Sequence, residues 1–161
     1  LTNPAGADRQ LMGVYDRNRT EVLALVLREL KASRAMVVSS HDGLDEISIA
    51  APTQVTELKA GTISTYNITP EELGLVTSPI SELAGRSAEE NAEIIRSIFK
   101  GEKGPNRDVV VANAGACLYI TGRCNNLQEG VQLAAELIDA GKAREKLEQL
   151  IQCTGELNHV S

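Results

Sequence analysis

The order of segments between residues 9 and 40 constrains the fold of this chain more than any other feature. A short apolar run at 9–15 precedes residues 20–32, where apolar side chains recur at helical spacing, and a β-branched run follows at 34–40. The economical interpretation of strand, helix and strand in this order is a parallel βαβ unit. We therefore predict an α/β domain whose sheet is mostly parallel and flanked by helices.

The middle of the chain predicts further strands and a loop. Residues 46–50 form a short strand candidate, although Pro52 limits its continuation as a central strand. Residues 53–69 alternate around a turn at 59–61, as a β-hairpin does. Residues 69–85 are polar and predict a long surface connection with at most one short helical turn.

The last part of the chain predicts helices. A serine and a glutamate three residues later form a capping box at the start of residues 87–101, which end in a glycine. Residues 108–122 are ambiguous, because the valines at 109–111 favour a strand whereas the length and the small residues favour a close-packed buried helix. Asn126 caps a helix that ends near residue 140, and Gly141 separates it from a final amphipathic helix.

The bulk properties limit the class of protein. A chain of 161 residues suits a single domain, residues 1–161, around one hydrophobic core. No apolar run approaches the roughly 20 residues of a membrane helix, so we expect no membrane partner. The 16 basic and 22 acidic residues give a formal charge of −6, and three tyrosines and one phenylalanine leave little for base stacking, so we expect no nucleic acid partner. Three cysteines without CxxC spacing predict reduced thiols in a cytoplasmic protein.

The segment HDGLDE, residues 41–46, is the main candidate for a functional site. It follows directly on the strand predicted at 34–40, and in open α/β sheets ligands collect at the carboxyl ends of the strands. Asp45 and Glu46 in extended backbone would point to opposite sides, which suits two hard cations, or one cation and a polar substrate group. Gly43 allows the tight turn that presents them. The alternative is a solvated acidic turn without a ligand, a common surface feature.

Other polar residues predict structure rather than chemistry. His41 is more typical of an ordinary loop histidine than of a general base. The GEKG turn at 101–104 has a lysine between glycines but lacks the spacing of a phosphate-cradling P-loop. Asn113, inside an apolar segment, is typical of a buried polar residue that fixes packing. No serine, cysteine or threonine stands in a recognisable nucleophile motif, so we name no catalytic residue.

Several motifs together resemble a known enzyme family. They stand in the order and at the spacing seen in anthranilate phosphoribosyltransferases: LTNPAG, RQLMGVYD, DGLDEIS, ENAEII, GEKGPNRD and VANAGACLYITG. The resemblance covers roughly residues 1–151, and GLDEIS is its most specific signal. One departure is the pair Ser39 and Ser40, which stands where members of that family often carry His-Gly.

The resemblance implies a fold and an activity. The fold is the large α/β domain of nucleoside phosphorylases and related phosphoribosyltransferases, with residues 108–122 as a helix. The activity is Mg²⁺-dependent transfer of the phosphoribosyl group from phosphoribosyl pyrophosphate (PRPP) to the amine of anthranilate in tryptophan biosynthesis. The role of the family's Asp-Glu pair, which binds magnesium on the pyrophosphate, carries over to Asp45 and Glu46.

The resemblance also implies that parts of the enzyme precede Leu1. The family's glycine-rich pyrophosphate loop, its lysine-containing loop, its anthranilate-associated arginine and the helical domain through which such enzymes usually form homodimers all come earlier. We therefore expect a fragment of a two-domain enzyme, inactive alone, whose substrate-binding residues lie elsewhere. The alternatives are a pyrimidine-nucleoside phosphorylase of the same fold and a non-catalytic paralogue that binds nucleic acid.

Overall fold

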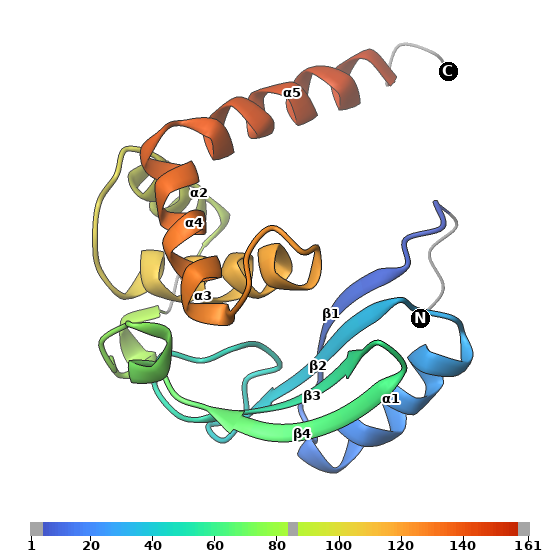
Figure 1. Cartoon of the computed structure of the whole chain (residues 1–161). Coiled ribbons are helices and arrows are strands. Elements are labelled where there is room, and N and C mark those ends of the chain that lie inside the picture. The colour runs from blue at the N-terminus through green and yellow to red at the C-terminus, as the bar shows by residue number, and fades with distance from the viewer. Residues whose placement is uncertain (1–4, 84–86, 158–161) are drawn as a thin grey trace.

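The computed structural model describes residues 5–83 and 87–157. One side of the molecule is a twisted sheet, and most of the helices stack above it (Figure 1). The strands and helices, in chain order, are β1 (Arg9–Gly13), α1 (Thr20–Glu29), β2 (Arg34–Ser40), β3 (Thr53–Lys59), β4 (Thr62–Ile68), α2 (Ala88–Phe99), α3 (Pro105–Ile120), α4 (Leu127–Asp139) and α5 (Lys142–Leu157). Short 3₁₀ turns occupy Arg17–Arg19, Glu71–Leu73 and Ile80–Leu83.

The predicted βαβ unit is confirmed, but the sheet is mixed rather than mostly parallel. β1 and β2 pair in parallel, and α1 connects them across one face. β2 and β3, and then β3 and β4, pair antiparallel, so the described sheet has the order β1-β2-β3-β4. The prediction assumed that the parallel pairing of the first two strands continues through the rest of the sheet. A parallel neighbour needs a crossover connection of a dozen or more residues, usually a helix, whereas the β3–β4 hairpin needs only two residues.

The hairpin predicted at 53–69 is present, with its turn at Ala60 and Gly61. Both residues have positive φ, 50° and 79°. A two-residue turn with φ > 0 at both positions has the type I′ geometry, whose twist matches that of the flanking strands.

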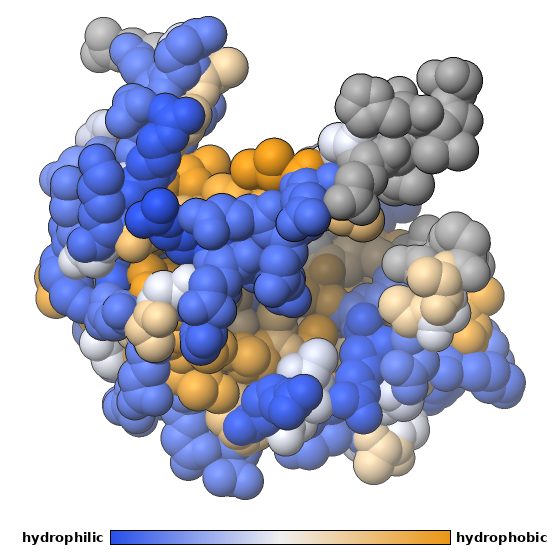
Figure 2. Space-filling view, turned by 90° about the horizontal axis from the view of Figure 1, so that it is seen from above, coloured by the Kyte–Doolittle hydropathy of each residue, from blue (hydrophilic) through white to orange (hydrophobic). Residues whose placement is uncertain are grey.

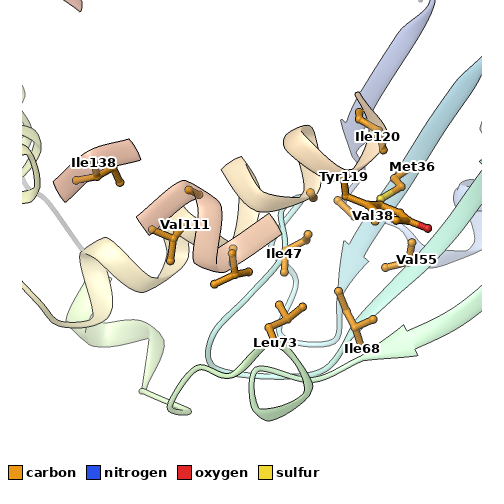
Figure 3. Close-up of a cluster of buried hydrophobic side chains, with 14 of the residues drawn as sticks. Met36, Val38, Ile47, Val55, Ile68, Leu73, Val111, Tyr119, Ile120 and Ile138 are labelled. Carbon is orange, nitrogen blue, oxygen red and sulfur yellow. The ribbon is translucent and has the colours of Figure 1, made fainter. Parts of the chain in front are cut away.

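Helices cover both faces of the sheet, as predicted. The face toward α1 buries a small cluster of apolar residues from α1, β2 and β3. The face toward α3 holds the larger core, where side chains of β2, β3, α3 and α4 meet (Figure 3). Met36 and Val38 of β2 point into this larger core, whereas Ala35 and Val37 point toward α1, as the period of two requires.

The ambiguous segment 108–122 is a helix, α3, which begins earlier than the segment, at Pro105. Its small residues bring α4 very close. A Cβ atom at Gly115 would lie 2.6 Å from the backbone nitrogen of Val131, and a Cβ atom at Gly130 would lie 2.4 Å from the carbonyl oxygen of Gly115. The backbones of the two helices therefore touch, which larger side chains would prevent.

The predicted helix starts are confirmed. Ser87 Oγ accepts the N–H of Glu90 at the start of α2, and Asn126 Oδ1 accepts the N–H of Glu129 at the start of α4. The connection at 69–85 has two 3₁₀ turns where the sequence predicted at most one, and Leu73 of the first turn is buried in the core. Residues 84 and 85 of that connection, and residues 1–4 of the first resembling motif, lie outside the described residues.

The final helix α5 extends away from the rest of the molecule (Figure 1). It carries the exposed apolar residues Leu147, Leu150 and Ile151, which the sequence predicts for an amphipathic helix. Figure 2 views the helical side and shows apolar patches among polar side chains. Within residues 5–83 and 87–157, no helix is both long and apolar enough to cross a membrane.

Candidate functional site

The predicted acidic pair lies at the carboxyl ends of the two parallel strands. Residues 41–52, which we call the acidic loop, connect the end of β2 to the start of β3. In the parallel register Gly13, the last residue of β1, stands opposite Val38 near the end of β2. Asp45 and Glu46 therefore occupy the edge at which ligands bind in α/β sheets, as predicted.

The acidic loop packs directly against the end of β1. A Cβ atom at Gly13 would lie 1.4 Å from the carbonyl oxygen of Asp45 and 2.5 Å from its carbonyl carbon. Both distances are far below any real contact, so the backbone of Asp45 lies in the space that a side chain at position 13 would need. Only glycine permits this approach.

The strand predicted at 46–50 is wrong. β2 already has β1 on one side and β3 on the other, so the segment finds no free edge beside it. Side chains satisfy part of its backbone instead: the N–H of Ser48 donates to Thr53 Oγ1 at 3.0 Å, and the N–H of Ala50 donates to Ser48 Oγ at 2.9 Å. Asp45 and Glu46 lie in a bend, so the alternation from which we predicted opposite-facing carboxylates does not apply.

Asp42 holds the first half of the loop together. Its carboxylate accepts Ser48 Oγ–H at 2.7 Å and the backbone N–H of Leu44 at 3.4 Å. Partial burial raises the pKa of Asp42, but hydrogen bonds from Ser40, Ser48 and the Leu44 backbone outweigh it, so the pKa lies below its usual value. Gly43 has φ of 92°, the turn conformation predicted for it. Asp42 is therefore a structural acid of the loop.

The second half of the loop is anchored at Ile47. Its side chain is 1% exposed and lies in the larger core between α3 and the sheet (Figure 3). Its backbone N–H donates to Asn113 Oδ1 at 3.0 Å, and its carbonyl oxygen accepts Asn113 Nδ2–H at 2.9 Å. This confirms Asn113 as a satisfied polar residue that fixes packing.

Asp45 and Glu46 lie between these anchors and are themselves exposed. Across residues 5–83 and 87–157, neither carboxylate has a hydrogen bond or an ion pair. Their oxygens are therefore available to an external cation.

The donor set fits magnesium better than a metal that needs a complete protein cage. In the described part of the chain, no three His, Cys, Asp or Glu side chains gather closely enough to hold a metal ion. Two neighbouring carboxylates supply hard oxygen ligands but leave most of an octahedral shell to other groups. Mg²⁺ is usually bound in this way, through one or two carboxylates together with waters and substrate phosphates.

The remaining candidates show no sign of chemistry. His41 is exposed, and its backbone N–H donates to the Pro52 carbonyl at 2.9 Å. In the GEKG turn, Lys103 pairs with Asp139 at 3.1 Å instead of being held for an anion. Asp139 also pairs with Arg107, which is 3% exposed, so this turn ties α3 to α4.

Sequence reasoning missed the two contacts that position the acidic loop. Nothing in the sequence places Gly13 beside Asp45, because the two are 32 positions apart and neither belongs to a turn motif with the other. The contact between Asn113 and Ile47 spans 66 positions. The only local signal was the pattern Ile47-Ser48-Ile49, in which two buried side chains flank a buried serine; this pattern suggested a strand rather than an anchor.

The chain matches the model of a protein family described as "Glycosyl transferase family, a/b domain" over residues 1–144. The chain belongs to this family. Its fold is that of the phosphoribosyltransferase members: the anthranilate phosphoribosyltransferase of Thermus thermophilus superposes with a TM-score of 0.78 at 38% identity, over 85% of this chain and 40% of that one. The Saccharomyces cerevisiae enzyme in complex with PRPP and Mg superposes with a TM-score of 0.83 at 25% identity, over 92% of this chain and 43% of that one.

Curated relatives of this chain are more similar to it in sequence than these solved structures are. The anthranilate phosphoribosyltransferase of Desulfatibacillum aliphaticivorans is 53% identical over 97% of this chain, and that of Symbiobacterium thermophilum is 51% identical over 98%. The chain spans 46% of the length of each, so about half of each relative has no counterpart here.

Proposed function

We propose that this chain is the α/β part of a longer anthranilate phosphoribosyltransferase. The reaction is transfer of the phosphoribosyl group from PRPP to the amine of anthranilate, with release of pyrophosphate, as a step of tryptophan biosynthesis in the cytoplasm. The observation that carries the proposal is the exposed Asp45–Glu46 pair on an anchored loop at the carboxyl ends of the parallel strands. Relatives about 50% identical over nearly the whole chain carry this enzyme's name. None of the relatives described above is a nucleoside phosphorylase or a nucleic-acid-binding protein.

In this proposal Asp45 and Glu46 hold Mg²⁺ against the pyrophosphate of PRPP. Two carboxylates cannot approach a polyanionic group without a cation between them, because like charges repel strongly at short distance. When bound, the ion neutralises negative charge that develops on the departing pyrophosphate. The solved yeast homologue in complex with PRPP and Mg supports this combination of ligands.

The chain's own contribution is to present two anionic ligands at a defined place. Ile47 holds the loop on the core side and Gly13 leaves room for it beside β1, so the backbone that carries the two carboxylates is already in place when substrate arrives. The incoming amine of anthranilate is itself the nucleophile, so the reaction needs none from the protein. The other contacts to both substrates, and the homodimer interface, are proposed to lie in the remaining part of the enzyme.

The test uses the natural protein at its full length, with loss of anthranilate fluorescence as the readout. We expect consumption of anthranilate only when PRPP and Mg²⁺ are both present. Asp45→Asn and Glu46→Gln should each lower kcat/KM by about 10²-fold or more, at an unchanged temperature of unfolding, because both side chains are exposed. Glu29→Gln, an exposed acid on α1 across the sheet, is the control and should leave activity unchanged. Wild-type protein that ignores anthranilate and PRPP would refute the proposal.

A further inference from the structure

One side chain of a distant helix bonds to the backbone of the acidic loop. Asn113 stands in the third turn of α3, and its amide pairs with both backbone groups of Ile47, the residue directly after the acidic pair. Asn113 Nδ2 also donates to the carbonyl oxygen of Val109 at 3.0 Å. Both amide hydrogens and the amide oxygen are thus used, and the partners fix the orientation, since the reverse orientation would set an NH₂ group against an N–H.

The Asn113 side chain makes the two hydrogen bonds to Ile47 that a neighbouring β-strand would otherwise make. A β-strand neighbour would offer one acceptor and one donor to Ile47, and no strand lies beside this segment of the described chain. Asn113 offers the same two groups from a side chain. Because Ile47 is 1% exposed, water cannot easily take the place of the amide.

Asn113 holds the loop two residues beyond its contact with β1. The backbone of Asp45 fills the space beside Gly13, and two residues later Ile47 is held by α3. The acidic pair therefore lies in a short bend between its contact with β1 and its contact with α3. A shift of the Ile47 backbone must move Glu46, its direct neighbour, with it.

We propose that Asn113 is a positioning residue for the metal-binding pair, acting through the backbone of Ile47 without touching substrate. The inference rests on the proposed function, because it gives Asp45 and Glu46 a ligand to hold. Loss of the amide frees the Ile47 backbone while leaving both carboxylates in the chain. Metal affinity and turnover should therefore fall even though every proposed ligand is still present.

The experiment compares Asn113→Ala with Val111→Ala in the natural protein at its full length. Val111 is buried two positions away on the same helix, so its truncation weakens the core without removing a hydrogen bond to the loop. Three quantities are measured: deuterium exchange of the peptide that contains Ile47, affinity for Mn²⁺ in the presence of PRPP by electron paramagnetic resonance, and the separate values of kcat and KM.

For Asn113→Ala we expect at least tenfold faster exchange at Ile47, about tenfold weaker Mn²⁺ binding, and a fall in kcat/KM for PRPP of about 10²-fold, with KM for anthranilate changed less than threefold. Val111→Ala should stay within threefold of wild type in all of these. Equal behaviour of the two variants would overturn the inference. If Asn113→Ala does not fold, Asn113→Asp, which keeps only the acceptor for the Ile47 N–H, is measured against the same expectations.

The same data separate this inference from the proposed function. A wild-type protein that does not use anthranilate, together with faster exchange at Ile47 in Asn113→Ala, refutes the function and leaves the anchoring of the loop intact. A wild-type protein that is active and loses activity with Asp45→Asn, together with an Asn113→Ala variant that matches Val111→Ala, refutes only the positioning role.

Discussion

Replacing Gly13 by alanine tests directly whether the backbone of the acidic loop is placed by the end of β1. Gly13 is not among the glycines with positive φ, so alanine fits its backbone conformation. The whole effect of the substitution therefore comes from the steric clash of the added Cβ atom. The new Cβ would lie 1.4 Å from the Asp45 carbonyl oxygen, whereas real contacts of this kind are not shorter than 3.0 Å. The two backbones must therefore separate by more than an ångström.

The loop is the part that should move. β1 is tied to β2 by the parallel ladder, and the N–H of Val14 donates to the Val38 carbonyl at 2.9 Å just beyond Gly13. Overpacking of this kind costs about 1–3 kcal/mol of unfolding free energy. Since a misplacement of about 1 Å in a reacting geometry can cost about 10²-fold in rate, kcat/KM should fall by about that factor.

The assay pairs stability with activity and uses Gly122→Ala as the control. Gly122 follows α3 at the opposite end of the sheet, has φ of 76°, and a Cβ atom there would meet nothing within 4 Å. Its substitution strains the backbone by about 1–2 kcal/mol and leaves the acidic loop untouched. Denaturant unfolding gives the free energies, and anthranilate fluorescence gives kcat/KM. If Gly13→Ala lost no more activity than Gly122→Ala, the close contact would not determine the site.

Three further changes test the fold itself. Ala60→Asn should raise the unfolding free energy by about 0.5–1 kcal/mol in denaturant titrations, because asparagine tolerates the positive φ of a type I′ turn better than alanine. Gly115→Ala should lower it by about 1–3 kcal/mol, because its Cβ would press on the Val131 backbone. The hydrogen bonds from Arg107 and Lys103 lower the pKa of Asp139 from 3.8 to about 2. The stability that this carboxylate adds is therefore complete above pH 3.8 and is lost as the pH falls through 2. Asp139→Asn should flatten this part of the curve of unfolding free energy against pH.

Local chemistry made much of the fold predictable from the sequence. The cap residues Ser87 and Asn126 determine helix starts through bonds to residues three positions away, and the hairpin turn at 60 and 61 depends only on its own backbone. Such features need no knowledge of the rest of the chain. The segment 108–122 is ambiguous in the sequence because its small residues make a close contact with α4. The periodicity of one segment does not show which other segment packs against it.

The errors arose where a distant element decides the structure. Residues 46–50 have the composition of a strand, but β1 and β3 occupy both edges of β2, and the segment is satisfied by side chains instead. β3 pairs antiparallel with β2, because the acidic loop returns the chain beside β2 without a crossover helix, and the sequence does not show on which strand β3 will pair. In both cases the local pattern described the residues correctly, and the neighbours supplied by the fold determined the outcome.

Within the acidic loop, the residues that stabilise it and the residues proposed to act are different. Asp42 and Ile47 are bonded or buried, whereas Asp45 and Glu46 have no hydrogen bond or ion pair with any described residue. The two adjacent carboxylates carry like charges and therefore repel each other. A cation that binds them relieves this repulsion. It should therefore raise the unfolding temperature of the wild-type protein and leave that of the Asp45→Asn, Glu46→Gln double variant unchanged.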